Sequence, residues 1–432
     1  MPNSVSMDTP SLLTKAARLK TPYWQVNHRM QKNHSVSRRI VLISTMPPLP
    51  FGHPPGGRWT YVLFKGLVER GHRVTMLVPC YDAGQQEELR DIFHASDYDL
   101  RTFLVAPQTP PRLRDKWYSF RRPHSYVFPP ALYRDVATVL SKPWDILHME
   151  DIWAGWVGLP YDRRKAVLNY LNLYRIDDGG RSCHSWRDFL DCRLRRHAEA
   201  RLAKAYPNIL ALTSRLASEL RMIAPRSHVD IIPLGIDLSR YEFRASCGYD
   251  DDVPVVSLIG SMHWYPSFSA AERLLTRLWP AIKSKIPKAR CQIVGWSAKN
   301  ALRQYVGMPD VEIAENVPDI QPYFEQTNVL LYAPGRGSGM KLKVMEAFAY
   351  GIPVVTTWEG VEGLAAQDGI HAGICDEDQG LIERTVSLLR QHDRRESQRL
   401  AARRLLESDC SPEATLNLVE RCYENIYFRQ GW

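Results

Sequence analysis

Short apolar runs that end in loops rich in glycine and proline, each followed by a helical stretch, recur along this 432-residue chain. The first unit has an apolar run at 40–44, a loop rich in proline with three glycines, a helical spacing over 59–70 and a second apolar run at 72–78. Runs that are apolar throughout are typical of strands buried on both faces of a parallel sheet. This order of strand, loop, helix and strand constrains the fold most, because it builds a doubly wound α/β sheet.

The same order continues in two blocks that are separated by a polar stretch. Further strands of the first block are predicted at 144–148, 165–169, 209–214 and 229–233, with a helix at 215–223. The second block has predicted strands at 255–260, 291–295, 329–332 and 353–356, with helices at 274–285 and 343–349. The sequence therefore predicts two doubly wound, Rossmann-like domains that face each other across a cleft. Ligands are expected in that cleft, beyond the carboxyl ends of the strands.

The domain boundaries are placed where this pattern lapses. Residues 241–252 are polar and end in three aspartates, so 244–253 is the predicted linker. It separates an N-terminal domain, 39–243, from a C-terminal domain, 254–410. Residues 411–432 are predicted to form a helical segment that returns to the N-terminal domain.

The charge balance and the cysteines limit the class of protein. An excess of 56 Lys and Arg over 47 Asp and Glu suits a nucleic acid, an anionic membrane or a phosphate-bearing partner. Residues 1–38 form a basic extension without the apolar core of a secretory signal, and no run is long and apolar enough to span a membrane. Eight scattered cysteines without a Cys-x-x-Cys pair are typical of reduced thiols. We therefore expect a cytoplasmic protein.

The strongest chemical signal is the segment 334–355, in which a loop with three glycines leads into a helix. Glycines let the backbone approach a ligand closely, and the start of a helix offers N–H groups and a positive dipole end to an anion. The charged residues of the segment are Arg336, Lys341, Lys343 and Glu346. Cations beside a carboxylate that can accept sugar hydroxyls predict a site for a nucleoside diphosphate. A plain turn with solvated lysines is the alternative. The Gly-Lys-Ser/Thr of a Walker loop is missing.

This segment resembles the donor-binding signature of retaining glycosyltransferase family 4, which has the GT-B fold. The family pattern is Glu, seven residues, Glu, and later Gly-x-Pro-Val-Val. Glu346 falls on the second Glu, which the resemblance implies grips the ribose of the nucleotide. Ser338 stands where the family has the first Glu, which touches the transferred sugar. Shorter segments in the family's order extend the resemblance to 39–427, namely 211–220, 231–237, 260–262, 293–295, 317–324 and 358–364.

The resemblance implies a retaining hexosyl- or glycosyltransferase with two Rossmann-like domains. Such an enzyme moves a sugar from a nucleotide-diphosphate sugar to an acceptor hydroxyl and needs no metal or other cofactor. The acceptor would be a sugar, a lipid-linked molecule or a small molecule, in the biosynthesis of surface glycans or natural-product glycosides.

The implied donor site is formed by the second domain. Lys341 and Arg336 would stabilise the leaving diphosphate, which the backbone at Met340 would face. Where the family places an Arg and a Lys after the first strand of this domain, this chain has Ser261 and Pro266, so His263 is expected to add positive charge. The predicted donor-binding residues are Ser261, His263, Gly295, Gly337, Ser338, Gly339, Met340, Lys341, Lys343 and Glu346.

The first domain would contribute the acceptor side. The family has a histidine near the reacting sugar, but that position falls on Leu171. His148, at the end of a predicted strand, is the catalytic candidate, with Glu150 and Asp151 beside it; a structural histidine is the alternative. Two loop residues, Gly56 and Gly57, would border the acceptor and the phosphates.

Other functions remain open. Basic and aromatic residues alternate between Arg112 and Arg122, and a second basic run spans 187–201, but no nucleic-acid module is present and acidic residues dilute both runs. No nucleic-acid partner is therefore expected, while peripheral contact with the inner membrane face stays an alternative. A GT-B sugar-nucleotide epimerase or another nucleotide-sugar enzyme would keep the fold and change the chemistry. Cys183, His184, Cys192 and His197 lack the spacing of metal ligands, so no metal is predicted.

Overall fold

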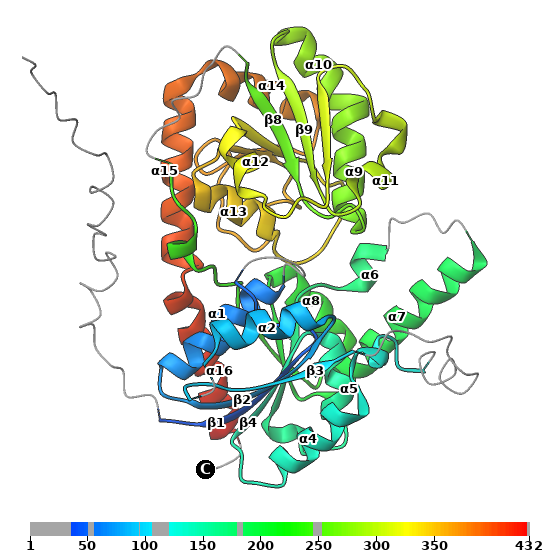
Figure 1. The fold of residues 1–432 in the computed structure, drawn as a ribbon, viewed down its shortest axis with the longest axis vertical. Coiled ribbons are helices and arrows are strands. Elements are labelled where there is room, and N and C mark those ends of the chain that lie inside the picture. Colours follow the sequence, from blue (N-terminus) through cyan, green and yellow to red (C-terminus); the bar gives the residue numbers. More distant parts are fainter. Residues whose placement is uncertain are drawn as a thin grey trace, which may run out of the picture. The chain divides into compact units, whose positions relative to one another are not determined.

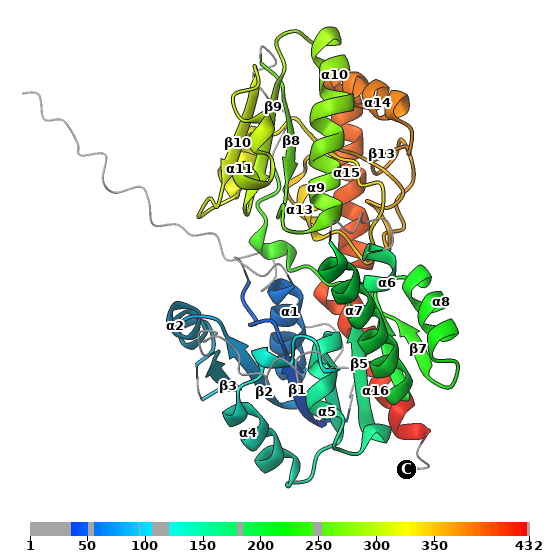
Figure 2. The same ribbon diagram turned by 90° about the vertical axis from the view of Figure 1, so that its right-hand side faces the viewer.

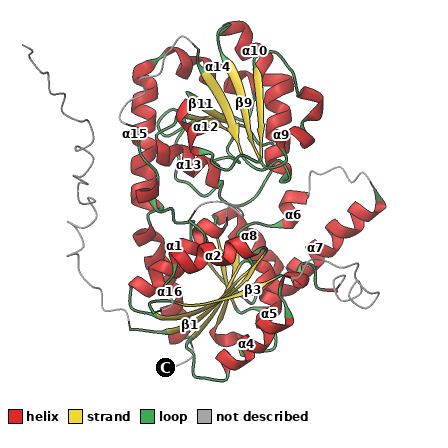
Figure 3. Cartoon of the chain, viewed as in Figure 1, coloured by secondary structure: helices red, strands yellow, loops and turns green. Residues whose placement is uncertain are grey.

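The computed structural model of the chain describes residues 36–50, 56–94, 96–105, 121–178, 185–244 and 253–429. Its strands form two separate parallel sheets, and helices pack on both faces of each sheet (Figures 1 and 3). Both sheets belong to one compact unit that begins at Ser37. The predicted α/β architecture with two doubly wound sheets is confirmed.

The first sheet has seven strands in the order β3-β2-β1-β4-β5-β6-β7. They are β1 (Arg39–Ser44), β2 (Arg73–Cys80), β3 (Asp99–Leu104), β4 (Ile146–Glu150), β5 (Ala166–Tyr170), β6 (Asn208–Ala211) and β7 (His228–Ile231). The order reverses at β1, which pairs with β2 on one side and with β4 on the other. The crevice beyond such a reversal is the usual ligand site of an open α/β sheet.

Alternate residues of β1 face two layers of helices, which is why this strand is apolar throughout. The helices of this part are α1 (Gly57–Glu69), α2 (Ala83–Ile92), α4 (Pro130–Leu140), α5 (Gly155–Gly158), α6 (Tyr174–Asp177), α7 (Trp186–Ala205) and α8 (Ser214–Ile223). Leu42 shares a core cluster with Phe64 of α1. Val41, one residue earlier, shares the other cluster with Val136 of α4. We call this sheet and its helices the first lobe.

The second sheet has six strands in the order β10-β9-β8-β11-β12-β13. They are β8 (Val255–Ile259), β9 (Arg290–Gly295), β10 (Val311–Glu315), β11 (Val329–Tyr332), β12 (Val354–Thr356) and β13 (Gly373–Ile374). The order reverses at β8, which pairs with β9 and with β11. The two sheets therefore repeat one topology, and each has its crevice at the strand where the order reverses.

Helices also cover both faces of the second sheet. They are α9 (Tyr265–Arg273), α10 (Trp279–Lys285), α11 (Ala298–Ala301), α12 (Gln321–Gln326), α13 (Leu342–Tyr350), α14 (Asp378–Arg390) and α15 (His392–Asp409). Both α13 and α14 contact β11 and β12, and α10 packs beside α14. Figure 2 shows α9 and α10 in line along this sheet. We call this part the second lobe.

The helix predicted at 274–285 is present, but it is not uniform and continues an earlier helix. α9 ends at Arg273, a π-helical turn spans Leu274–Leu278, and α10 starts at Trp279. Pro280, the second residue of α10, has no N–H to donate to the preceding turn. The π turn accommodates this missing hydrogen bond.

The last helix, α16 (Pro412–Phe428), packs on α1 and on α15. A Cβ on Gly66 of α1 would lie 2.2 Å from Cδ1 of Leu416, so the glycine allows the two helices to approach closely. The Tyr423 hydroxyl of α16 lies 2.6 Å from Nδ1 of His148 on β4, and both side chains are buried. The chain thus leaves the first lobe, forms the second lobe and ends on the first.

Three strands were not predicted, and each lies at the edge of a sheet. They are β3, β10 and β13. An edge strand has one neighbour, so its sequence need not be apolar throughout; β3 reads Asp-Leu-Arg-Thr-Phe-Leu. β13 has only two residues.

Several predictions concern residues outside the described ranges. They include nearly all of the basic extension 1–38, most of the linker 244–253, residues 112–120 of the first basic run, and the pair Cys183 and His184. Within the described ranges, no helix is long and apolar enough to cross a membrane. The six cysteines there are all free.

The buried contact between Tyr423 and His148 predicts a measurable contribution to stability. Tyr423→Phe leaves Nδ1 of a buried histidine without its partner, which should lower the free energy of unfolding by about 1–3 kcal/mol. Urea unfolding followed by circular dichroism measures this loss. Tyr427→Phe, on the same helix but at a partly exposed residue, should change stability little. Equal effects of the two substitutions would contradict the assigned role of the hydrogen bond.

Candidate functional site

The loop between β11 and α13, residues 333–341, lies beside the strand reversal of the second sheet. It starts at the carboxyl end of β11, which pairs with β8 and β12. α13 has no side-chain cap and no acidic residue in its first turn. Its first N–H groups and the positive end of its dipole can therefore receive an anion.

Gly339 of this loop has to be glycine. Its φ is 73°, in the left-handed region that residues with a side chain seldom adopt. A Cβ there would lie 2.1 Å from the carbonyl oxygen of Leu171 in the first lobe. The loop backbone therefore packs directly on the first lobe.

Asp177, the last residue of α6, holds the loop from the first lobe. Ser338 donates to Oδ1 of Asp177 from its backbone N–H, at 2.7 Å, and from its hydroxyl, at 2.9 Å. The Ser338 hydroxyl also accepts from the backbone N–H of Leu173 at 2.8 Å. Burial raises the pKa of Asp177 to about 6. The Asp177 carboxylate of the first lobe thus lies against Ser338, the residue at the position where the family signature has its first Glu.

Lys341 is a buried cation rather than a solvated one. Its ammonium group donates to the carbonyl of Gly339 and lies 3.6 Å from Oε2 of Glu362. Burial lowers the pKa of Lys341, while the charge of Glu362 opposes this shift. Arg336, in contrast, is exposed and donates from Nε to the carbonyl of Ile176 at 2.9 Å. Lys341 and Arg336 therefore have different surroundings.

Lys343, on the first turn of α13, is half-buried. Its Nζ lies 2.6 Å from the Ser267 hydroxyl and 4.4 Å from the centroid of the Tyr332 ring. Burial, together with the charge of Lys341, lowers the pKa of Lys343 to about 7. Neither of its two contacts is with a carboxylate, so Lys343 has positive charge to offer an anion near α13.

Glu346 lies one turn further along α13 and is buried. Its Oε1 pairs with Nη1 of Arg58 from α1 and accepts from the Tyr241 hydroxyl at 3.3 Å. Its other oxygen, Oε2, has no hydrogen-bond partner among the described residues. Burial raises the pKa of Glu346, and the charge of Arg58 opposes the shift. One oxygen of this carboxylate is thus available to a sugar hydroxyl.

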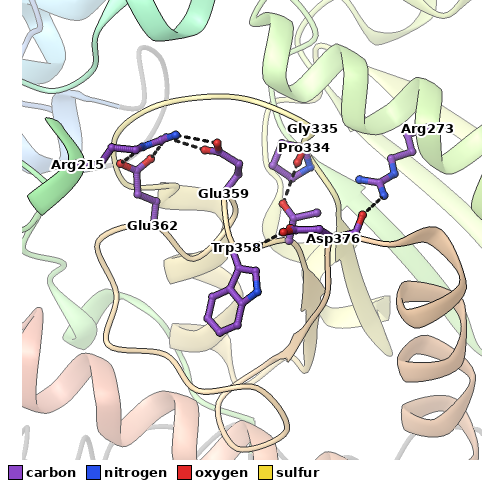
Figure 4. A pocket seen from close by; sticks show the side chains of 9 residues that line it. Arg215, Arg273, Pro334, Gly335, Trp358, Glu359, Glu362 and Asp376 are labelled. Atoms are coloured by element: carbon purple, nitrogen blue, oxygen red, sulfur yellow. Dashed lines mark hydrogen bonds and ion pairs between the residues drawn. The ribbon is translucent and has the colours of Figure 1, made fainter. Parts of the chain in front are cut away.

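Arg215 of α8 connects the lobes beside a cavity (Figure 4). Its guanidinium pairs with Glu359 at 2.7 Å and with Glu362 at 2.5 Å, and it donates to the carbonyl of Gly337. The cavity has a volume of about 480 Å³ and is also lined by Arg273, Pro334, Gly335, Thr357, Trp358 and Asp376. Its three carboxylates outnumber its two guanidinium groups, so a diphosphate is not expected there.

The predicted residues at the ends of β8 and β9 lie at the same edge of the sheet. A Cβ on Gly295 would lie 1.8 Å from the carbonyl oxygen of Gly260, so these strand ends are in backbone contact. Ser261 is half-buried and His263 is exposed. The His263 ring makes no hydrogen bond with the described residues, and its role in binding stays a prediction.

His148 and Glu150 form a buried network on β4. Nε2 of His148 lies 3.0 Å from Oε2 of Glu150, and Nδ1 faces Tyr423. Asn169 donates to both oxygens of Glu150, at 2.9 and 3.1 Å. Both ring nitrogens of His148 are thus occupied, and the structure does not bring it to the loop 333–341. Its contacts are those of a structural histidine, and its catalytic role stays a prediction.

Asp151 follows β4 with a φ of 85° and is buried. It accepts two backbone hydrogen bonds from the turn that follows and bonds the hydroxyl of Thr45, the residue after β1. Burial raises the pKa of Asp151 to about 7. Gly56 and Gly57 begin α1, where a Cβ on Gly57 would lie 2.4 Å from the carbonyl oxygen of Pro47. These residues lie at the crevice edge of the first sheet.

Three charged residues of the first lobe that contact the predicted site were not predicted from the sequence. They are Arg58, Asp177 and Arg215. Arg58 had one local signal, since it follows the glycine pair that precedes α1. The other two had none, because only the tertiary structure brings them to the loop.

No metal site is formed within the described part of the chain, where no three His, Cys, Asp or Glu side chains are placed to hold an ion. Cys192 and His197 lie on α7, and the Cys192 thiol is 3.3 Å from a nitrogen of Arg195.

Both lobes match known family models. Residues 56–235 match the glycosyl transferase 4-like domain, and residues 253–391 match the glycosyl transferases group 1. No curated protein sequence matches the chain.

Solved structures of glycosyltransferases share the fold. Sucrose-phosphate synthase from Thermosynechococcus elongatus is 17% identical, with a TM-score of 0.68, over 91% of this chain and 100% of that chain. HepE of Anabaena, in complex with UDP-glucose, is 13% identical, with a TM-score of 0.63, over 90% and 99%. WaaG, a glycosyltransferase involved in lipopolysaccharide biosynthesis, is 15% identical, with a TM-score of 0.61, over 89% and 99%. These likenesses confirm the predicted GT-B fold. The second lobe therefore belongs to the glycosyl transferases group 1 and the first lobe to the glycosyl transferase 4-like domains, so the chain is a glycosyltransferase.

Proposed function

We propose that this protein transfers a sugar from a nucleotide-diphosphate sugar to an acceptor hydroxyl with retention of configuration. The observation that carries the proposal is the start of α13, where an uncapped helix end, Lys343 and the carboxylate of Glu346 occur together. HepE of Anabaena was solved with UDP-glucose, and TarM of S. aureus with UDP, which supports a nucleotide-sugar donor here.

The leaving diphosphate would bind at this helix end. Negative charge develops on the bridging oxygen as the bond to the sugar breaks. The first N–H groups of α13 and the charge of Lys343 would stabilise it, with Lys341 behind the loop. Because these groups are held by the fold, little reorganisation accompanies the reaction. In this proposal they supply the positive charge, so no divalent metal takes part.

The nucleoside would be held by Glu346. Its Oε2 can accept a ribose hydroxyl while Oε1 keeps Arg58 and Tyr241. On the side of the transferred sugar, Asp177 would provide the carboxylate that position 338 lacks. The Ser338 hydroxyl donates to Oδ1 of Asp177 at 2.9 Å and so holds this carboxylate against the loop. The donor would then contact both lobes.

The acceptor would enter from the first lobe. The proposal assigns a sugar, a lipid-linked molecule or a small molecule to this role. WaaG acts in lipopolysaccharide biosynthesis and TarM was solved with a GlcNAc-glycerol, so acceptors of these kinds occur among proteins of this fold. Surface-glycan or natural-product glycoside biosynthesis is the proposed context.

Binding of nucleotide sugars tests the proposal directly. We expect calorimetry with the glucose conjugates of UDP, GDP, ADP and dTDP to show binding to at least one, and NMR to show slow donor hydrolysis that first releases the α-anomer. Lys341→Ala should weaken binding about tenfold or more, because it removes a buried cation beside the loop. Lys285→Ala, which removes an exposed cation at the end of α10, is the matched control. Absence of binding to all four nucleotides would refute the proposed function.

The pKa of Lys343 predicts a pH dependence of binding. Below pH 7 its ammonium group is charged and attracts a phosphate, and above pH 7 this attraction is lost as the group deprotonates. Lys343→Met should therefore weaken diphosphate binding strongly at pH 6 and little at pH 9. At each pH the dissociation constant of Lys343→Met is divided by that of the wild type. Titration of the nucleotide itself affects both constants equally and therefore drops out of this ratio. A ratio that stays constant from pH 6 to pH 9 would show that Lys343 does not contact the phosphates.

A further inference from the structure

Arg58 joins the first turn of α1 to the interior of α13. It is the second residue of α1, directly after the glycine pair, and its Nη1 pairs with Oε1 of Glu346. The side chain is 13% exposed. The ion pair therefore joins the start of α1, in the first lobe, to the Glu346 carboxylate, which lies one turn inside α13 of the second lobe.

One edge of the Arg58 guanidinium has no hydrogen-bond partner within the described ranges of the chain. Its Nε is buried without a hydrogen bond, and Nη2 has no partner among the described residues. Leaving a buried donor unpaired is costly, so such a group in a fold calls for an explanation, and a bound ligand is one. The edge formed by Nε and Nη2 carries two parallel N–H groups, which match two oxygens of one phosphate group.

Among the described residues, the hydrogen bonds of the Glu346 carboxylate are likewise confined to one of its two oxygens. Oε1 holds Arg58 and Tyr241, while Oε2 has no described partner. Each member of the ion pair thus keeps one side for its partner and one side free. A ligand with a hydroxyl beside a phosphate would satisfy both free sides without breaking the pair.

The charges around the pair favour an anion. Neither α1 nor α13 has a side-chain cap or an acidic residue in its first turn, so both contribute positive dipole ends. Lys343 on α13 adds a cation. The loop after β8 contributes none beyond the exposed His263, since Ser261 stands at its start.

We infer that Arg58 binds the diphosphate of the nucleotide sugar through its Nε and Nη2 edge while Nη1 stays on Glu346. The inference rests on the proposed function and adds a phosphate ligand that comes from the first lobe. Arg58 is then a binding residue, oriented by Glu346, that supplies the charge missing after β8. The other role for Arg58 is to neutralise Glu346 and cover it, which would make the arginine a competitor of the nucleotide.

Nucleotide affinities separate these two roles. Dissociation constants are measured by calorimetry for wild type, Arg58→Ala, Arg58→Lys and the control Lys65→Ala. Lys65 lies on the same helix, where it pairs with Glu69 and lies over the ring of Tyr61. The probes are UDP, GDP, ADP and dTDP, followed by the monophosphate and the free nucleoside of the base that wild type binds best.

A phosphate-binding Arg58 predicts an effect that depends on the phosphates. Arg58→Ala should weaken the diphosphate about 10- to 100-fold and the nucleoside less than about twofold. Arg58→Lys keeps the charge but loses the paired N–H groups, so it should weaken the diphosphate about fivefold. Lys65→Ala should change neither affinity.

Other outcomes overturn the inference. If Arg58→Ala changes diphosphate and nucleoside affinity by the same factor, or strengthens both, the arginine only covers Glu346. If Arg58→Ala does not fold, as judged by circular dichroism, an Arg58→Lys variant with unchanged diphosphate affinity refutes the inference. If wild type binds none of the four diphosphates, the proposed function fails and this inference fails with it.

Discussion

The loop between β11 and α13 depends on hydrogen bonds from the other lobe. Asp177 accepts two hydrogen bonds from Ser338, and the backbone of Leu171 packs against Gly339 at a distance that excludes a side chain. A loop with three glycines would otherwise lose much conformational entropy on ordering. The first lobe therefore fixes the shape of a segment that the second lobe contributes, and the site is a property of both.

Buried charges around this loop come in compensated sets. Lys341 is near Glu362, Arg215 pairs with Glu359 and Glu362, and Glu346 pairs with Arg58. Isolated buried charges would be very costly, and pairing across the lobes lowers this cost. Lys343 differs, because its contacts are a hydroxyl and an aromatic ring. Lys343 is therefore a cation near this loop whose charge is not compensated by a direct contact with a carboxylate of the described residues.

Much of the fold was predictable because central strands of parallel sheets are apolar throughout. β1 and β11 have this pattern, and the glycine-rich loops that follow them lie at the crevices. Edge strands such as β3 lack it and were missed. The local chemistry of Lys343 and Glu346 could be read from a single segment. The surroundings of Lys341 could not, since Glu362 and Arg215 reach it only through tertiary contacts.

The packing of α16 on α1 affects the order in which the chain can fold. Leu416, Val419 and Tyr423 belong to the same core cluster as Phe64 and Leu42. This face of the first sheet is therefore incomplete while the ribosome is still translating the second lobe. Domains usually fold as units during synthesis, N-terminal first. Here the first lobe must wait for α16, so its apolar face stays open to chaperones, or to aggregation, until that helix has been translated.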